Sequence, residues 1–251
     1  IFPSYLNFEM RDYQVLKGLV FSDNKPQDFT VIVEVLKNTP EDSLELAVTV
    51  TSIAEEKETT HYRAIMSLLR KIPPRPVQSD LASKASLPVI KDGDFFYNEK
   101  VLFHGPAFRG LKSVLRVTED ELTTVCHLPA VPRTVQGQFP AEVTNPYAND
   151  VVLQGVLAWS FHNHEKVCLP AGIEQIIQYQ SLPFDKDIFV DVKIVSQSRM
   201  RAKANAVMFD QNGQIYMVAN GIEGTMSKAL RSLFKASATS VESAPIPQGE
   251  I

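Results

Sequence analysis

The 251-residue chain lacks the features that mark several large classes of protein. It has only two cysteines, Cys126 and Cys168, without metal-ligand or redox spacing, so both are expected to be small buried residues. No apolar run approaches the roughly 18 residues of a membrane span, and no signal-peptide pattern is present, which predicts a cytoplasmic protein with no membrane partner. A net charge of −4 without a dense basic cluster argues against nucleic acid as a partner.

Nucleotide, nucleophile and metal motifs are also missing. The chain contains neither GxGxxG nor GxxxxGK[ST], so no dinucleotide or nucleoside triphosphate is implied, and it has no GxSxG nucleophile elbow. His162 and His164 stand two apart at the end of an expected helix and do not share a face. With no acidic or cysteine partner at ligand spacing, they predict no metal site.

Strand patterns dominate the rest of the chain. Segments rich in β-branched residues and bounded by turn residues predict strands, with no long helical pattern before residue 75. The expected strands are 13–21, 28–36, 44–53, 60–69, 188–197, 202–209 and 215–225. Asp210-Gln211-Asn212-Gly213 is expected to form the hairpin turn between the last two.

One buried helix is predicted to begin near residue 146. Asn145 suits the N-cap and Pro146 the first helical position, and apolar residues then run nearly all the way round the helix. Asp150 and Gln154 interrupt this surface from the same face, four residues apart. A buried carboxyl group has its pKa raised by desolvation and can donate a proton, with the amide holding it in place. Alternatively, Asp150 only interacts favourably with the positive end of the helix dipole and faces water.

Three motifs in order carry a resemblance to a known family. The run from His104 to Leu111, within Leu102–Leu111, resembles the YGPxFxGL motif of polyketide-synthase dehydratase domains, and Asp150–Gln154 matches their DxxxQ motif. Leu169-Pro170 resembles the LP start of the strand after the catalytic helix. The resemblance spans roughly residues 95–230. It is greatest to the dehydratase-like region beside the ketoreductase in the large subunit of bacterial polyunsaturated fatty acid synthases.

The resemblance implies an α+β double hotdog fold, in which each half wraps a curved antiparallel sheet around one helix. On that basis we expect an N-terminal hotdog at residues 1–75, incomplete at its front, and a linker at 76–92 that begins in the Pro-rich run 72–76. A C-terminal hotdog is expected at 93–235, followed by a disordered tail at 236–251.

The resemblance also implies elimination of water from a 3-hydroxyacyl thioester. In the family a histidine removes the α-proton and an aspartate protonates the departing hydroxyl; here Asp150 matches the acid and Gln154 its orienting partner. The histidine motif, HxxxGxxxxP, is absent, because none of the five histidines has its spacing. His104 stands where the family has tyrosine, as a hydrogen-bond donor near the substrate oxygen whose role would depend on pH around 6 to 7; alternatively it caps the strand before the turn.

Substrate and partners follow from the same resemblance. The acyl chain would arrive on the phosphopantetheine of an acyl carrier protein, with no cofactor of the domain's own, beside ketoreductase and ketosynthase domains. Arg109 and Arg199 are candidates to contact the carrier protein, or are ordinary surface charge. The expected substrate-binding residues are Phe103, Gly105, Pro106, Phe108, Leu153, Leu157, Leu169 and Pro170, with Val151 a further candidate. A catalytically silent double hotdog and a product-template-like domain that guides cyclisation remain open as alternatives.

Overall fold

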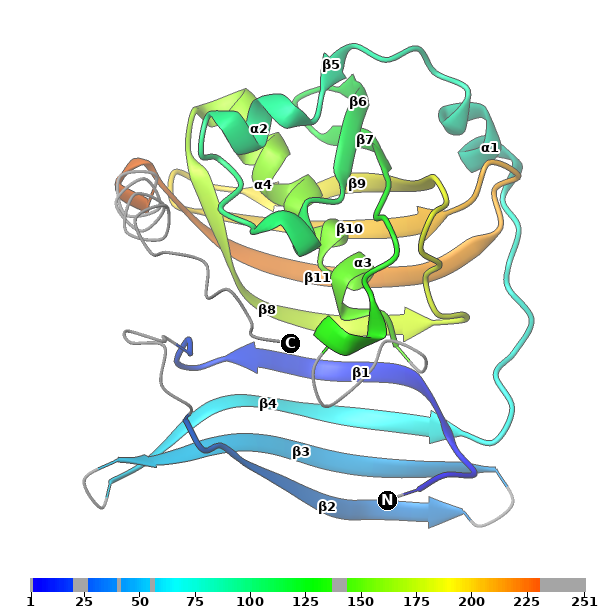
Figure 1. The fold of residues 1–251 in the computed structure, drawn as a ribbon, viewed down its shortest axis with the longest axis vertical. Coiled ribbons are helices and arrows are strands. Elements are labelled where there is room, and N and C mark those ends of the chain that lie inside the picture. The colour runs from blue at the N-terminus through cyan, green and yellow to red at the C-terminus, as the bar shows by residue number, and fades with distance from the viewer. Residues whose placement is uncertain (1, 20–26, 40–41, 55–56, 137–143, 231–251) are drawn as a thin grey trace, which may run out of the picture.

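The structure is a computed structural model that describes residues 2–19, 27–39, 42–54, 57–136 and 144–230. Within these ranges one antiparallel sheet of eleven strands runs through the molecule in the order β2-β3-β4-β1-β8-β11-β10-β9-β7-β6-β5 (Figure 1). Its strands are β1 (Leu6–Val15), β2 (Thr30–Thr39), β3 (Ser43–Ala54), β4 (Lys57–Leu69), β5 (Lys91–Asp92), β6 (Leu111–Val117), β7 (Glu121–Cys126), β8 (Val167–Gln178), β9 (Ile188–Gln197), β10 (Arg201–Phe209) and β11 (Ile215–Ser227). The helices are α1 (Ser79–Ala85), α2 (Asp94–Asn98), α3 (Pro146–Asn149) and α4 (Val151–His164), with 3₁₀ turns at Pro106–Phe108 and Arg133–Val135.

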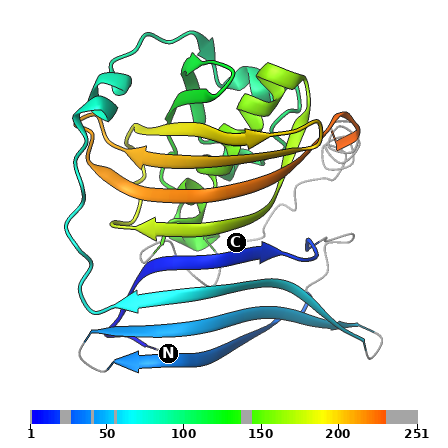
Figure 2. The ribbon, with the colours of Figure 1, turned by 180° about the vertical axis from the view of Figure 1, so that it is seen from behind.

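The same four-strand connectivity occurs twice in this sheet. Strands β1 to β4 run outward from the centre as β1-β4-β3-β2, and strands β8 to β11 run outward as β8-β11-β10-β9. The two units meet where β1 pairs with β8, with Tyr13 opposite Ile173. The view from behind shows both units curving in the same sense, one above the other (Figure 2). The fold is therefore built from two related halves joined edge to edge.

In the C-terminal half the curved sheet encloses helix α4. The helix buries residues on every side, as the sequence predicted, and Trp159 at its centre is fully buried. Gly155 allows the helix to approach strand β9 closely, because a Cβ atom there would lie 3.1 Å from Val192 Cγ2. Strands β5, β6 and β7 extend the sheet beyond β9 and complete the wrap around the helix.

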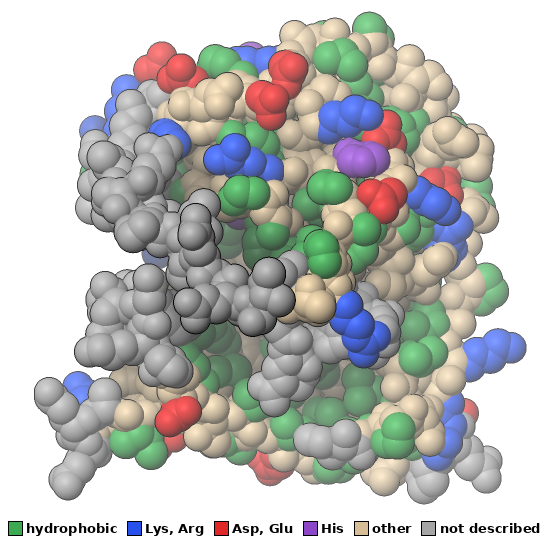
Figure 3. Space-filling view, in the orientation of Figure 1, with side chains coloured by type: hydrophobic (Ala, Val, Ile, Leu, Met, Phe, Trp, Pro, Cys, Tyr) green, Lys and Arg blue, Asp and Glu red, His purple; other side chains and the backbone are tan. Residues whose placement is uncertain are grey.

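The N-terminal half has one apolar face and one polar face. Side chains of Met10, Met66, Leu46 and Val35 lie in register across the four strands and share the apolar face. Ion pairs such as Arg11–Glu45 lie on the opposite face. None of the described helices packs closely against strands β2 and β3. Hydrophobic side chains accordingly line the hollowed lower part of the molecule (Figure 3).

Most expected strands are confirmed, with one correction. Residues 28–36, 44–53 and 60–69 fall in β2, β3 and β4, but the segment predicted at 13–21 is wrong, since β1 spans Leu6–Val15. A bulge between Arg11 and Gln14, with Asp12 at a φ of 53°, breaks the alternation that marks a strand. The chain leaves the sheet soon afterwards, where Leu16 N–H bonds the His61 carbonyl at 2.9 Å.

The turn between β10 and β11 and the burial of both cysteines are confirmed. Gly213 N–H bonds the Asp210 carbonyl at 2.9 Å with a φ of 75°. Both thiols are buried. None of the helices in the described ranges is long and apolar enough to cross a membrane.

The proposed division at residues 1–75, 76–92 and 93–235 stays a prediction. The expected linker carries helix α1 and touches the hairpin through a bridge between Val77 and Gln214. The expected disordered tail, 236–251, lies outside the described residues.

Candidate active site

Asp150 stands at the junction of two helices. The Asn145 side chain caps α3 by accepting from Ala148 N–H at 3.1 Å, as predicted for this N-cap, and Pro146 is the first helical residue. The single helix predicted from residue 146 is nevertheless two helices, because α3 ends at Asn149 and α4 begins at Val151. Asp150 is thus the residue before α4, with its side chain 25% exposed. This position places the carboxylate at the positive end of a long buried helix.

Two donors converge on one oxygen of Asp150. Gln154 Nε2 donates to Asp150 Oδ2 at 2.8 Å, which confirms that the two side chains share a face. His104 Nε2 lies 3.0 Å from the same oxygen. In this arrangement Oδ2 accepts from the Gln154 amide and from the His104 Nε2–H group. The other oxygen, Oδ1, receives no hydrogen bond from the residues that the structure describes, so it is the oxygen left for a ligand.

His104 is held in place by its neighbours. Its ring stacks on Phe103 with centroids 4.6 Å apart and planes at 18°. The backbone then enters the 3₁₀ turn through Gly105 and Pro106, where the Phe108 N–H bonds the Gly105 carbonyl at 2.9 Å. His104 Nδ1 is buried and has no hydrogen-bond partner in the described part of the chain. The histidine therefore contacts Asp150, and the alternative that it caps a strand is wrong, because no strand lies between α2 and the turn in the described residues.

Gln154 is fully buried, and its amide is hydrogen-bonded at both ends. Its Nε2 donates also to the Phe108 carbonyl at 2.7 Å, and its Oε1 accepts from the Tyr97 hydroxyl at 2.6 Å. The Tyr97 hydroxyl in turn accepts from Leu111 N–H at 2.8 Å. Burial raises the pKa of Tyr97 far above its ordinary value, so the phenol stays protonated. Sequence reasoning missed Tyr97, because it lies 57 residues from its partner and belongs to none of the three motifs.

A cavity of about 380 Å³ opens beside Asp150, where the two halves of the sheet meet. Its walls come from both halves: β1 and β4 on one side, and α3, α4, β8 and β11 on the other. The walls are mostly apolar, with polar side chains gathered near α3. They are formed by Asn7, Met10, Tyr13, Met66, Phe108, Thr144, Pro146, Asn149, Asp150, Val152, Leu153, Ile173, Ile176, Gln178 and Met217.

The structure brings together only some of the residues expected to bind substrate. Phe108 and Leu153 line the cavity, and Gly105 and Pro106 form the turn between His104 and Phe108. Phe103 is 49% exposed and does not line the cavity, because its ring faces His104.

Four other expected lining residues lie away from the cavity. Leu157 is 2% exposed, one turn deeper along α4 than Leu153, and belongs to the core, as does the fully buried Val151. Leu169 is 41% exposed, because it alternates along β8 with the buried Cys168 and points outward. Pro170, which follows it on β8, is likewise not part of the cavity wall.

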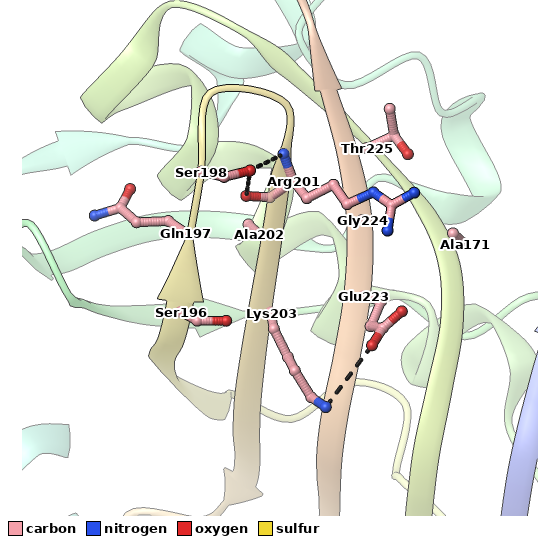
Figure 4. A pocket seen from close by; sticks show the side chains of 10 residues that line it. All are labelled: Ala171, Ser196, Gln197, Ser198, Arg201, Ala202, Lys203, Glu223, Gly224 and Thr225. Carbon is pink, nitrogen blue, oxygen red and sulfur yellow. Dashed lines mark hydrogen bonds and ion pairs between the residues drawn. The ribbon is translucent and has the colours of Figure 1, made fainter.

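A second hollow, of about 320 Å³, lies at the β9–β10 hairpin (Figure 4). Polar side chains from β9, β10 and β11 line it, and Lys203 there already pairs with Glu223 at 3.7 Å. Asp150, Gln154 and His104 do not reach this hollow. Of the two arginines considered for carrier contact, Arg109 is beside Asp150's network, with its Nε 3.3 Å from the His104 carbonyl, whereas Arg199 lies in this hairpin.

Residues 76–233 match the family described as polyketide synthase dehydratase N-terminal domain. The chain belongs to this family. A polyunsaturated fatty acid synthase polypeptide of Thraustochytrium sp. (strain ATCC 26185 / S-3) is 24% identical over 224 residues, which make up 86% of this chain. The chain spans only 8% of the length of that relative.

Solved dehydratase domains share the fold of this dehydratase-family chain. The dehydratase domain of RzxB from Pseudomonas fluorescens has a TM-score of 0.64 at 15% identity, with 87% of this chain and 75% of that chain covered. The dehydratase domain of a mycocerosic acid synthase-like polyketide synthase has a TM-score of 0.67 at 21% identity, with coverages of 87% and 73%. These likenesses confirm the α+β double hotdog fold.

Proposed function

We propose that this chain is the dehydratase region of a multidomain polyketide or polyunsaturated fatty acid synthase, and that Asp150 is its acid. The observation that carries the proposal is the geometry of the carboxyl group. Two donors hold Oδ2, while Oδ1 is free of described partners at the wall of a mostly apolar cavity. Family membership and the synthase relative support the multidomain setting.

The proposed reaction converts a 3-hydroxyacyl thioester into a 2-enoyl thioester and water. A base removes the α-proton, the electron pair forms the new C–C double bond, and the C–O bond at carbon 3 breaks. Asp150 Oδ1 gives its proton to the departing hydroxyl, so that water leaves. The resulting carboxylate is stabilised by the hydrogen bonds from His104 and Gln154. A positioned acid of this kind contributes on the order of 10²–10⁴-fold in rate.

The substrate is proposed to arrive on the phosphopantetheine of an acyl carrier protein in the cytoplasm, with its acyl chain in the cavity. The domain needs no cofactor of its own for this chemistry. Met10, Met66 and Met217 give part of the cavity a flexible apolar lining that adapts to an extended chain. Arg109, beside the His104 carbonyl, is the proposed contact for the acidic carrier protein, and neighbouring ketoreductase and ketosynthase domains would supply and consume the thioesters.

The proton-accepting base is the missing component. The described residues that line the cavity include no histidine or lysine, and His104 is already bonded to the acid. We propose that the base is a histidine elsewhere in the parent polypeptide, so that this chain alone binds acyl thioesters but turns them over poorly. The same observation favours the second candidate function, a catalytically silent double hotdog that binds acyl chains.

An N-terminally extended chain and the present chain, incubated with a 3-hydroxyacyl-carrier protein, test the proposal by mass-spectrometric detection of water loss. Asp150→Asn should lower turnover of the extended chain by on the order of 10²–10⁴-fold. Asp187→Asn, which removes a carboxylate outside the cavity, is the matched control and should leave turnover unchanged. Full activity in Asp150→Asn would refute the assignment of the acid. Acyl binding without turnover in the extended chain would support the silent alternative.

A further inference from the structure

Tyr97 lies outside the three motifs but connects two of them, because its hydroxyl bonds Leu111 at the end of the first motif and Gln154 in the second. It lies in α2, is 3% exposed, and its hydroxyl stands between Leu111 N–H at 2.8 Å and Gln154 Oε1 at 2.6 Å. A buried hydroxyl with two partners at these distances is fully satisfied. Replacing it by an apolar group would leave both partners buried without a hydrogen bond.

The direction of each hydrogen bond around Tyr97 and Gln154 follows from the groups involved. A backbone N–H only donates, so the phenol oxygen accepts from Leu111, and its single proton is left for Gln154. The Gln154 atom that faces Tyr97 must therefore be the carbonyl oxygen. Its NH₂ group then faces the Phe108 carbonyl and Asp150 Oδ2, both of which accept. No other assignment of the amide satisfies all three of its partners.

The network also polarises the amide. Donation from the phenol to Oε1 withdraws charge from the carbonyl and makes the opposite N–H a stronger donor to Asp150. The N–H bond to Oδ2 is most favourable when the carboxyl group is ionised, which is its state after it has given up a proton. The Tyr97 hydroxyl thus acts on the carboxylate through one intervening side chain.

We propose that Tyr97 is a positioning residue for Asp150, which it orients through the Gln154 amide so that Oδ2 is held and Oδ1 is presented to the cavity. This inference rests on the proposed function for its catalytic meaning, but the orientation of the amide can be measured without turnover. It predicts that Tyr97 and Gln154 act as a single unit. It also predicts that the loss of the hydroxyl affects the chemical step rather than acyl binding.

The first test reads the Gln154 side-chain amide by ¹H–¹⁵N NMR in the present chain. Tyr97→Phe should shift both amide protons and make them exchange faster with solvent. Tyr216→Phe is the matched control, a buried tyrosine of the same half whose hydroxyl is outside this network, and should leave the Gln154 signals in place. Unchanged Gln154 signals in Tyr97→Phe would overturn the proposal.

If Tyr97→Phe does not fold, 3-fluorotyrosine at position 97 keeps the ring and hydroxyl but makes the phenol a stronger donor. The Gln154 NH₂ protons should then move further downfield, and an absence of movement would count against the proposal. Because neither NMR experiment needs substrate, both remain decisive if the dehydratase assignment itself fails.

The second test is a double-mutant cycle in the N-terminally extended chain. Tyr97→Phe should lower kcat by on the order of 10- to 100-fold, the range typical for losing a group that orients a functional side chain, with KM within about 2-fold. Gln154→Leu should lower kcat to a similar degree, and the double variant should be no worse than Gln154→Leu alone. Additive losses would show that Tyr97 acts independently of Gln154. If the unmutated extended chain shows no activity, the proposed function fails, whereas the NMR experiments still decide this inference.

Discussion

The two halves of the sheet share one connectivity and differ in what their concave faces contact. In the C-terminal half, α4 fills the concave face, and its central residues Trp159 and Ala158 are fully buried. In the N-terminal half, Val31 and Val35 of β2 are 60% and 49% exposed. The same strand order thus forms with and without a described helix on it, so connectivity comes from the strands and their turns, whereas burial comes from the helix.

This difference also explains where the site lies. Asp150 is placed by the buried half, through α4 and the Gln154 network, while the other wall of the cavity comes from Met10 and Met66 of the open half. A rigid acid therefore faces an apolar wall that carries few charged groups. This difference predicts that substitutions in the C-terminal half destabilise the fold far more than equivalent substitutions in the N-terminal half.

Thiol reactivity should show the largest contrast. Burial raises the pKa of Cys126 and Cys168 to about 12, so few molecules carry a reactive thiolate at pH 8, and access is blocked as well. Val35→Cys introduces a thiol at a 49% exposed position of the open half. It should react with iodoacetamide at least about 10³-fold faster than either native cysteine. Mass spectrometry of the alkylated peptides measures the ratio, and equal rates would show that the C-terminal half opens easily.

Truncation of side chains should give the next largest difference. Trp159→Ala removes a fully buried ring whose Nε1 donates to the Glu119 carbonyl at 3.1 Å, and should cost about 3–5 kcal/mol of unfolding free energy. Val35→Ala should change it by no more than about 0.5 kcal/mol, as at other exposed sites. Urea denaturation measures both. Trp159→Phe, which keeps most of the packing, should fall between them, and an equal cost for Val35→Ala would mean that its face is covered in solution.

The sequence was sufficient for the features that local pattern determines. The Asn145 cap, the shared face of Asp150 and Gln154, and the Gly213 turn were predicted because each depends on residues within a few positions of one another. The family resemblance supplied the fold and singled out His104, whose contact with Asp150 was then seen in the structure. The break between α3 and α4 was not predicted, because Asp150 itself has helical dihedrals and no strong helix breaker marks the junction.

Features that depend on distant contacts could not be predicted. Tyr97 meets Gln154 only because α2 lies beside α4 in the folded protein. The outward position of Leu169 depends on the register of β8, and a shift by one residue would have placed it inside. Met10 and Met66 reach the cavity through the pairing of β1 with β4 and β8, which no single segment encodes.

Substitutions at the seam, where β1 pairs with β8, should destabilise the protein less than the loss of Trp159. A Cβ atom on Gly172 would lie 2.9 Å from the Tyr13 carbonyl oxygen on the paired strand β1. Gly172→Val should therefore cost about 1–3 kcal/mol, the usual range for overpacking, and should speed amide hydrogen exchange in β1 more than in β10. Gly18→Val, at a position with no atom within 4 Å of a Cβ, is the control. Uniform loss of protection in both strands would argue against a weak seam.

The contribution of surface ion pairs to stability should differ least between the halves. Partial burial by itself would raise the pKa of Asp187, but hydrogen bonds from Lys112 and His127 outweigh it and lower the pKa below its ordinary value of 3.8. A lowered native pKa stabilises the fold above the ordinary value, and this stabilisation is lost as the pH falls through the native value. Because Asp187 is largely exposed, Asp187→Asn should cost no more than about 1 kcal/mol at pH 6, and the difference should disappear in urea titrations near pH 2 to 3.

Glu45→Gln breaks the ion pair with Arg11 on the outer face of the N-terminal half. It should lower the free energy of unfolding by no more than about 1 kcal/mol at pH 6. Added salt screens both this pair and that of Asp187, so the effect of each variant should stay small there. Comparing Asp187→Asn with Glu45→Gln shows whether charge or burial causes the difference in stability between the halves. If both effects are small and similar, the contrast seen with Trp159→Ala and Val35→Ala comes from packing against α4. A much larger cost for Glu45→Gln would instead mean that the open half depends on its polar outer face for stability.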